Sequence, residues 1–205
     1  MNLIDEILAA SAAGDRDRVE LLKEQRNQLV EEHARLNAEA EQPILRDLEA
    51  VGEHVGSVWD FVNTSRPYPQ ALPVLLRHLQ LGGYPDRVME SLGRALAVKP
   101  SVQWRDTLVD CYLNARSHGE RTGAGVALAA CVTKAQFDEF AWLAALELDD
   151  PSRIRGIFLK PLVRIDRERG WTVVASLMDD PVSGVQARLM LKQKAKREAK
   201  SAIGN

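Results

Sequence analysis

The 205-residue sequence has little of several residue types, and each shortage restricts fold or function. Aromatic residues make up 5% of the chain, which favours helices packed through Leu, Ala and Val over aromatic-rich strands. Cys111 and Cys131 are the only cysteines, which is typical of small buried side chains in a reducing compartment and not of a disulfide framework. No apolar run approaches the roughly 18 residues of a membrane-spanning helix.

Motifs for catalysis, metals and phosphates are missing as well. The sequence has no G-x-S-x-G elbow, no C-x-x-C pair and no H-E-x-x-H helix. The glycines of GERTGAG come without the lysine of a phosphate-binding loop, and helix capping explains the Asp pairs at 149–150 and 179–180 better than Mg²⁺ does. All four histidines are expected at the surface or at edges: His33, His54, His78 and His118. We therefore expect no catalytic residue, no cofactor and no metal.

Charge is distributed unevenly along the chain. The formal net charge of −2 gives no overall attraction to nucleic acid or anionic lipid. Residues 1–60 carry −8, however, and residues 151–205 carry +7, so the chain is suited to pair with itself or to bind opposite charges at its two ends. The first residues lack a basic segment and include Asp5 and Glu6, which argues against a secretory signal and for a cytoplasmic protein.

The first 42 residues predict a helical arm. A short helix ends near Gly14, and a charged helix follows in which Leu22, Leu29 and Leu36 recur every seven residues. Arg26 and His33 occupy the other seam positions, so the heptad pattern is only half apolar. The arm either packs against its own domain or associates with a second copy. Pro43 is expected to break or restart this helix.

A helical hairpin recurs in the rest of the chain. Its first copy is ALPVLLRHLQLGGYPDRVMESLGRALAV, Ala71 to Val98. An acidic residue beside Gly or Pro returns every 30 to 34 residues ahead of an apolar helix, namely Asp86, Glu120, Asp150 and Asp180. A carboxylate accepts hydrogen bonds from the free amides of a helix start, so each is expected to cap the helix that follows it.

These hairpins, with ALPVLLRHL as a first helix and DPSRIR as the start of a second, resemble the HEAT-repeat family. The resemblance implies an all-α fold, a right-handed α-α superhelix of about four hairpins over residues 69–195. Residues 1–42 would be the arm, 43–68 a capping segment with its loop, and 196–205 a basic tail. Glycine-rich GERTGAGVALAA and Gly184 depart from the family pattern and interrupt the expected ladder of Asp–Arg contacts.

Two sets of residues are candidate binding sites. The resemblance would place the outward faces of the second helices in one groove; the alternative is an ordinary solvated face. Its members are Arg87, Glu90, Arg94, Arg121, Arg155 and Arg164. The loop SVWDFVNTSRPYPQ either covers the open end of the repeats or forms an interaction patch, because aromatic residues and Arg carry interface energy. Its members are Trp59, Asp60, Asn63, Arg66 and Tyr68. The spacing of Trp104, Trp142 and Trp171 follows the repeat and favours packing between repeats.

The sequence therefore predicts a non-catalytic scaffold or adaptor that binds another protein, with acidic proteins among the candidates, through the groove or the arm. By analogy, a small bacterial HEAT protein of this kind could be an immunity-type inhibitor. The alternative is a HEAT-like nucleic-acid-binding protein or DNA glycosylase. Such a protein needs a continuous positive surface, and only the last third of this chain is basic, so nucleic acid is not the expected partner.

Overall fold

The computed structural model describes residues 3–146 and 154–203, and these residues form helices without a β-strand. The prediction of an all-α protein is thus confirmed. Within this part of the chain no helix is both long and apolar enough to cross a bilayer. The chain divides into two compact units, Met1–Pro43 and Ile44–Asn205.

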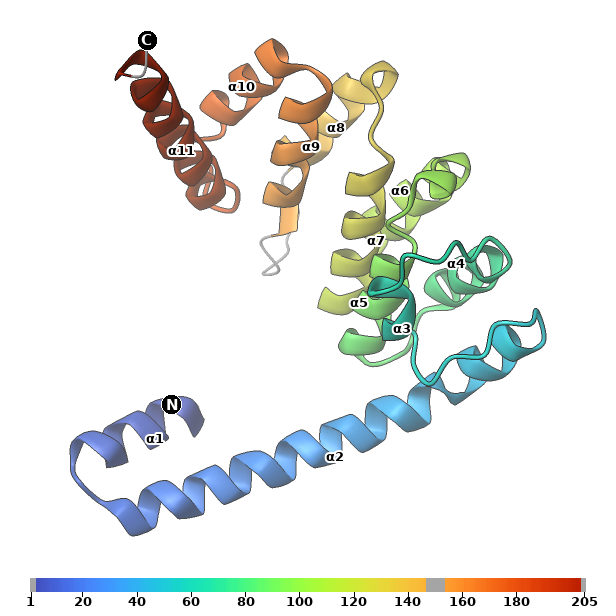
Figure 1. Cartoon of the computed structure of the whole chain (residues 1–205), viewed down its shortest axis with the longest axis vertical. Helices are drawn as coiled ribbons and strands as arrows, with labels where there is room; N and C mark the ends of the chain where they lie inside the picture. Colours follow the sequence, from blue (N-terminus) through green and yellow to red (C-terminus); the bar gives the residue numbers. More distant parts are fainter. Residues whose placement is uncertain (1–2, 147–153, 204–205) are drawn as a thin grey trace. The chain divides into compact units, whose positions relative to one another are not determined.

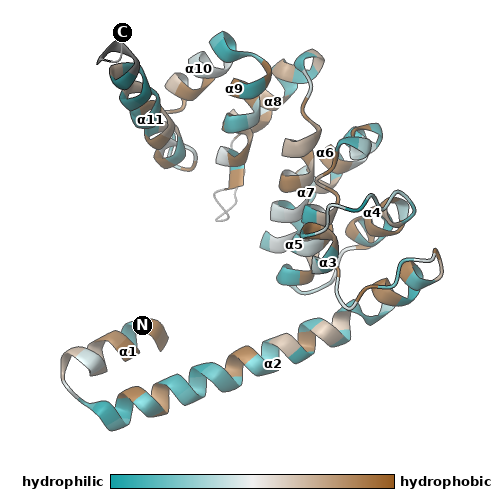
Figure 2. Cartoon of the chain, viewed as in Figure 1, coloured by the Kyte–Doolittle hydropathy of each residue, from teal (hydrophilic) through white to brown (hydrophobic). Residues whose placement is uncertain are grey.

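The first unit contains helix α1 (Leu3–Ala12) and most of helix α2 (Arg16–Glu49). Arg18 on α2 lies 3.9 Å from the Glu6 carboxylate on α1. Figure 2 shows α2 mostly hydrophilic with separated hydrophobic positions. Among the heptad leucines Leu22 is buried, whereas Leu29 and Leu36 are about half exposed. The choice between self-association and packing on the same chain stays a prediction.

The expectation that Pro43 interrupts the second helix is wrong. Helix α2 continues past Pro43 to Glu49. A proline inside a helix removes the hydrogen bond to the carbonyl four residues earlier, here that of Glu39. Glu39 is exposed, so water can hydrate that carbonyl. The cost is offset further along, where Ile44 and Leu48 of the same helix are fully buried.

The second unit is a succession of short helices that pack on their neighbours along the chain (Figure 1). After the end of α2 come α3 (Trp59–Val62), α4 (Ala71–Leu81), α5 (Asp86–Ala95), η1 (Lys99–Trp104), α6 (Arg105–Leu113), α7 (His118–Cys131), η2 (Lys134–Gln136), α8 (Phe137–Ala145), η3 (Ile154–Phe158), α9 (Leu159–Ile165), α10 (Arg167–Ser176) and α11 (Gly184–Ile203). The predicted hairpins correspond to α4–α5, α6–α7, α8 with η3–α9, and α10–α11. The predicted basic tail continues α11 as far as Ile203.

Helices α5 and α7 touch through their backbones. A Cβ atom added to Gly93 on α5 would lie 2.0 Å from the carbonyl oxygen of Gly123 on α7, and one added to Gly123 would lie 2.4 Å from the Met89 carbonyl oxygen. Only glycine permits so close an approach. Gly93 and Gly123 therefore let α5 and α7 approach closely.

The acidic residues at the hairpin turns connect successive hairpins. The prediction that Asp86 caps its own helix, α5, is wrong. Its carboxylate instead accepts a 2.9 Å hydrogen bond from the amide of Gly119, in the first turn of α7. Glu120 of α7 in turn accepts a 3.2 Å bond from the Gly83 amide in the α4–α5 turn. The close approach of α5 and α7 places each carboxylate within reach of the other hairpin. Asp180 accepts from the amides of Val182 and Ser183 just ahead of α11, and Asp150 lies outside the described residues.

The repeated positions are not equally buried. Leu159 is fully buried, but Leu189, its match in the sequence pattern, is 47% exposed. Trp142 is 50% exposed and so does little of the inter-repeat packing expected of it, whereas Trp104 and Trp171 are half-buried. Helical periodicity alone does not distinguish a helix covered on both sides from one at the end of the stack.

Leu92→Ala and Leu159→Ala should each lower the free energy of unfolding by about 2–5 kcal/mol, because both side chains are fully buried. Urea denaturation followed by circular dichroism measures the change. Leu189→Ala is the matched control and should stay within about 0.5 kcal/mol of the wild type. A shift as small as that of the control at either buried position would contradict the assigned core.

Both cysteines are free thiols; Cys131 is buried, as predicted, whereas Cys111 is partly exposed. Burial raises the pKa of Cys131 to about 11. Burial also raises the pKa of Cys111 to about 11, with a further contribution from the negative charges of Asp110 and Glu120. Both side chains therefore remain protonated at neutral pH, in the form that is a poor nucleophile.

Candidate partner-binding surface

Trp59 of α3 lies against a row of charged residues on α5. The guanidinium carbon of Arg87 is 4.8 Å from the centroid of the Trp59 ring, and that of Arg94 is 5.9 Å away. Glu90 accepts hydrogen bonds of 2.8 and 2.6 Å from Nε and Nη2 of Arg94. These α5 residues are spaced by three and four positions, which puts them on one face of the helix. The structure thereby joins three predicted groove residues to the most aromatic part of the predicted loop.

The short helix α3 is fixed by the Asp60 carboxylate. Oδ2 of Asp60 accepts hydrogen bonds from the amides of Gly56 at 2.9 Å and Ser57 at 3.1 Å. Asn63 is exposed and ends α3. Asp60 thus fixes the start of the short helix that carries Trp59, whereas Asn63 is exposed at its end.

The loop after α3 is anchored at two points. The Tyr68 hydroxyl donates a 2.8 Å hydrogen bond to the Ala95 carbonyl of α5, and its ring centroid lies 4.6 Å from that of Phe61. Burial raises the pKa of Tyr68, so the hydroxyl stays a donor at neutral pH. The exposed Arg66 side chain forms an ion pair with the buried Glu53 carboxylate. Both loop residues therefore hold the loop in shape.

A hollow of about 340 Å³ opens between this loop and the end of α5. Its wall is largely apolar, with Phe61, Val62 and Leu72 among the lining residues. Arg66 and Arg94 supply positive charge. We call the area formed by α3, residues 63–70 and the Arg87–Arg94 face of α5 the α3–α5 surface.

Positive charge at the α3–α5 surface is only partly neutralised. Arg94 is paired with Glu90, and Arg66 with Glu53. Arg87 is exposed, lies over the Trp59 ring and forms no ion pair with a carboxylate among the described residues. Nε1 of Trp59 is buried and has no hydrogen-bond acceptor among these residues. The surface thus combines an available guanidinium, an aromatic ring and an apolar hollow, the combination found at the centres of protein interfaces.

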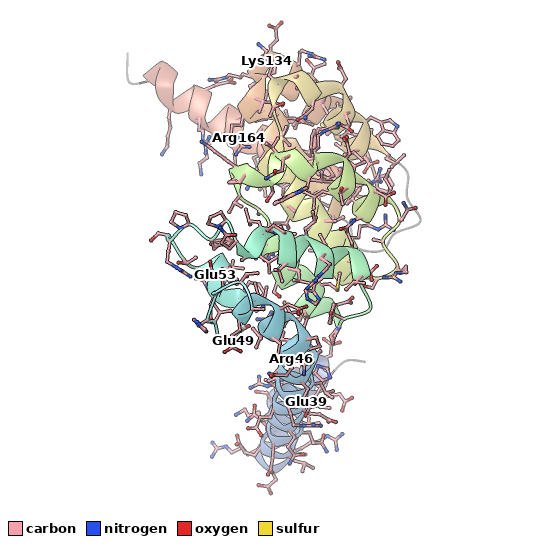
Figure 3. The ribbon with its side chains drawn as sticks, turned by 90° about the vertical axis from the view of Figure 1, so that its right-hand side faces the viewer. Glu39, Arg46, Glu49, Glu53, Lys134 and Arg164 are labelled. Atoms are coloured by element: carbon pink, nitrogen blue, oxygen red, sulfur yellow. The ribbon has the colours of Figure 1, made fainter. Side chains whose placement is uncertain are left out.

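Three other predicted groove residues, Arg121, Arg155 and Arg164, lie outside the α3–α5 surface, on later elements of the chain. Arg121 donates to the carbonyls of Tyr112 and Ala115, at 3.0 and 3.2 Å, and so binds the end of α6. Arg164 is exposed on α9, and Figure 3 shows it well away from Glu53, which anchors the loop.

The prediction that Arg155 faces outward is wrong, because this residue is 3% exposed. Its guanidinium donates to the Ala145 carbonyl at 3.1 Å and to both Asp180 carboxylate oxygens at 3.4 Å. Arg155 therefore connects the end of α8 with the turn before α11, and it cannot contribute to a binding surface.

A polar cluster around the buried His78 side chain was not predicted from the sequence. His78 was expected at the surface but is 3% exposed; its ring nitrogens lie 2.7 Å from the Tyr84 hydroxyl and 2.8 Å from Asp47 Oδ2. Burial and the negative charge of Asp47 raise the pKa of Tyr84, which therefore keeps its proton. The cluster ties the end of α2 to the α4–α5 turn. Its signal in the sequence is the position of His78 within the apolar stripe of ALPVLLRHL.

Among the described residues, no three His, Cys, Asp or Glu side chains come close enough together to hold a metal ion. Comparisons of the chain with protein-family models, curated proteins and solved structures give no match.

Proposed function

We propose that the second unit is a stack of HEAT-like hairpins that binds another protein at the α3–α5 surface, without catalysis. The stacking part of the proposal is supported by helix contacts. The second helix of each hairpin packs on that of the next: α5 on α7, α7 on η3, and η3 on α11. This order of contacts is the one expected of a repeat protein, in which each unit contacts its neighbours.

The observation that carries the binding proposal is the meeting of the predicted loop and the predicted groove at Trp59. Arg87 and Arg94 lie over the Trp59 ring, and the apolar hollow adjoins Arg94. The ligand that fits is a segment with a carboxylate for Arg87 and an apolar side chain for the hollow. Such an acidic, partly apolar peptide gains from guanidinium pairing and from burial together.

Charge reversal tests this proposal. Wild type and Arg87→Glu/Arg94→Glu are used in parallel to capture partners from the native host, and a captured protein is then titrated against both. Reversing both charges removes the attraction that steers an acidic partner and also the pairing of its carboxylate with Arg87. The variant should therefore associate about tenfold more slowly and dissociate faster at low salt, and added salt should narrow the difference in association rate. Stopped-flow or surface-based kinetics measure the rates.

Two further variants locate the effect. Arg164→Glu on α9 reverses one charge at an exposed site away from the α3–α5 surface and should leave the association rate unchanged. Ser65→Glu places a negative charge in the wall of the hollow. This charge repels an acidic partner, so the partner should dissociate faster. Tyr68→Ala is not a suitable probe, because Tyr68 is buried and bonded to α5. Equal rates for wild type and the Arg87/Arg94 variant at low salt would refute the proposal.

A further inference from the structure

Residues of three helices near the end of the chain line a second, basic site. Two adjoining open hollows of about 660 and 530 Å³, sizes typical of ligand sites, lie among α9, α10 and α11 and share Arg167, Trp171, Lys194 and Glu198. Lys160 of α9 and Arg197 of α11 also line them. Arg167 and Trp171 are four residues apart, and Lys194 and Arg197 three, so each pair lies on one helix face. We call this the Trp171 site.

The cations of the Trp171 site are largely free to bind a ligand. Lys160, Arg167 and Arg197 have no ion pair or hydrogen bond from their side chains among the described residues. Lys194 lies 4.0 Å from Glu198, at the limit of an ion pair, and 4.9 Å from the centroid of the Trp171 ring. Glu168 and Glu198 are the carboxylates in the lining, so the cations outnumber them two to one.

The surrounding segment extends this positive charge. From Leu159 to Ile203 the sequence has ten Lys or Arg residues against five Asp or Glu residues. On α11, four of them recur at every fourth position and are exposed: Arg188, Lys192, Lys196 and Lys200. The net charge of −2 for the whole chain conceals this local excess, which attracts anions at short range.

We propose that the Trp171 site binds single-stranded nucleic acid, a role beyond the proposed protein-binding function and independent of it. Cations from three helices suit any polyanion. A half-buried tryptophan among them specifically suits a strand whose unpaired bases can stack on an aromatic ring while its phosphates meet the cations. A peptide of acidic residues alone offers no flat base to stack on this ring.

The test measures the binding of a fluorescein-labelled oligothymidylate of about 16 nucleotides to the full chain by fluorescence anisotropy. If the four cations neutralise four phosphates, affinity should fall about 50-fold between roughly 50 and 200 mM salt. Arg167→Gln/Arg197→Gln should weaken binding at least about tenfold at the lower salt concentration and halve the salt dependence. Arg87→Gln/Arg94→Gln removes the same charge at the α3–α5 surface and should change neither quantity.

The role of the ring is tested separately. Trp171→Leu should weaken binding at least about fivefold with the salt dependence unchanged, and Trp171→Tyr should retain most of the affinity, because stacking needs an aromatic face and not a charge. Circular dichroism checks the fold of each variant; if Trp171→Leu does not fold, the Tyr variant and the exposed Arg pair decide. The proposal is overturned by absence of binding at low salt, by polyglutamate competing as well as the oligonucleotide, or by a duplex binding equally well.

Discussion

Gly93→Ala should destabilise the protein by about 3 kcal/mol or more, although alanine is the better helix former. At an unobstructed helix position the same change stabilises by about 1 kcal/mol. Here the new methyl group would lie 2.0 Å from the Gly123 carbonyl oxygen, and this neighbour is backbone that cannot rotate aside. Helices α5 and α7 must separate, and the bonds from Gly119 to Asp86 and from Gly83 to Glu120 lengthen with them. Urea denaturation measures the loss.

Gly56→Ala is the control for this experiment. Its methyl group would meet Asp60 Oδ2 at 3.7 Å, an ordinary contact, so its stability should stay within about 0.5 kcal/mol of the wild type. Gly123→Ala should resemble Gly93→Ala, because its methyl group would lie 2.4 Å from the Met89 carbonyl oxygen. A gain in stability at Gly93 would show that the two backbones are not in contact.

Arg155→Met should lower the free energy of unfolding by about 3–5 kcal/mol, because it leaves the largely buried Asp180 carboxylate without its cation. The Asp180 side chain is 13% exposed and that of Arg155 4%. The variant also leaves the Ala145 carbonyl without the Arg155 donor. Arg164→Met, at an exposed position, is the matched control and should change the free energy of unfolding by less than about 0.5 kcal/mol.

A double variant distinguishes loss of the ion pair from loss of packing. In Arg155→Met/Asp180→Asn the buried charge is removed with its partner, so the cost should be smaller than the sum of the two single changes. The double variant should still be less stable than the wild type, since Asp180 also accepts hydrogen bonds from the amides of Val182 and Ser183. Strict additivity in chemical denaturation would contradict a direct Arg155–Asp180 interaction.

Local features of the fold could be predicted from the sequence, because their causes lie within one or two turns of helix. The hairpin at Ala71–Val98 and the start of α5 at Asp86 follow from apolar periodicity and the Gly-Gly-Tyr-Pro turn. The path of α2 past Pro43 could not be predicted in this way. It depends on Ile44 and Leu48 being buried in the second unit, a tertiary contact that outweighs one missing hydrogen bond.

The sequence could indicate individual residues of the candidate site, but it could not indicate which of them come together. Trp59 and Arg94 each stand out by residue type, but nothing local indicates that α3 lies on α5, 35 positions further along the chain. Arg155 illustrates the opposite case. An arginine in a polar stretch is normally at the surface, and the carboxylate that compensates its burial, Asp180, is 25 residues away. Pairings at that separation are decided by packing and leave no spacing pattern in the sequence.

The glycine contact between α5 and α7 has a consequence for how this chain can change during evolution. In a stack of hairpins each unit contacts only its neighbours, so a new unit can be inserted only where the junction accepts both of its faces. The junction of Gly93 with Gly123 accepts only another bare backbone. A hairpin inserted between α4–α5 and α6–α7 would need glycine on both of its faces. The hairpins α4–α5 and α6–α7 should therefore be inherited together as a pair.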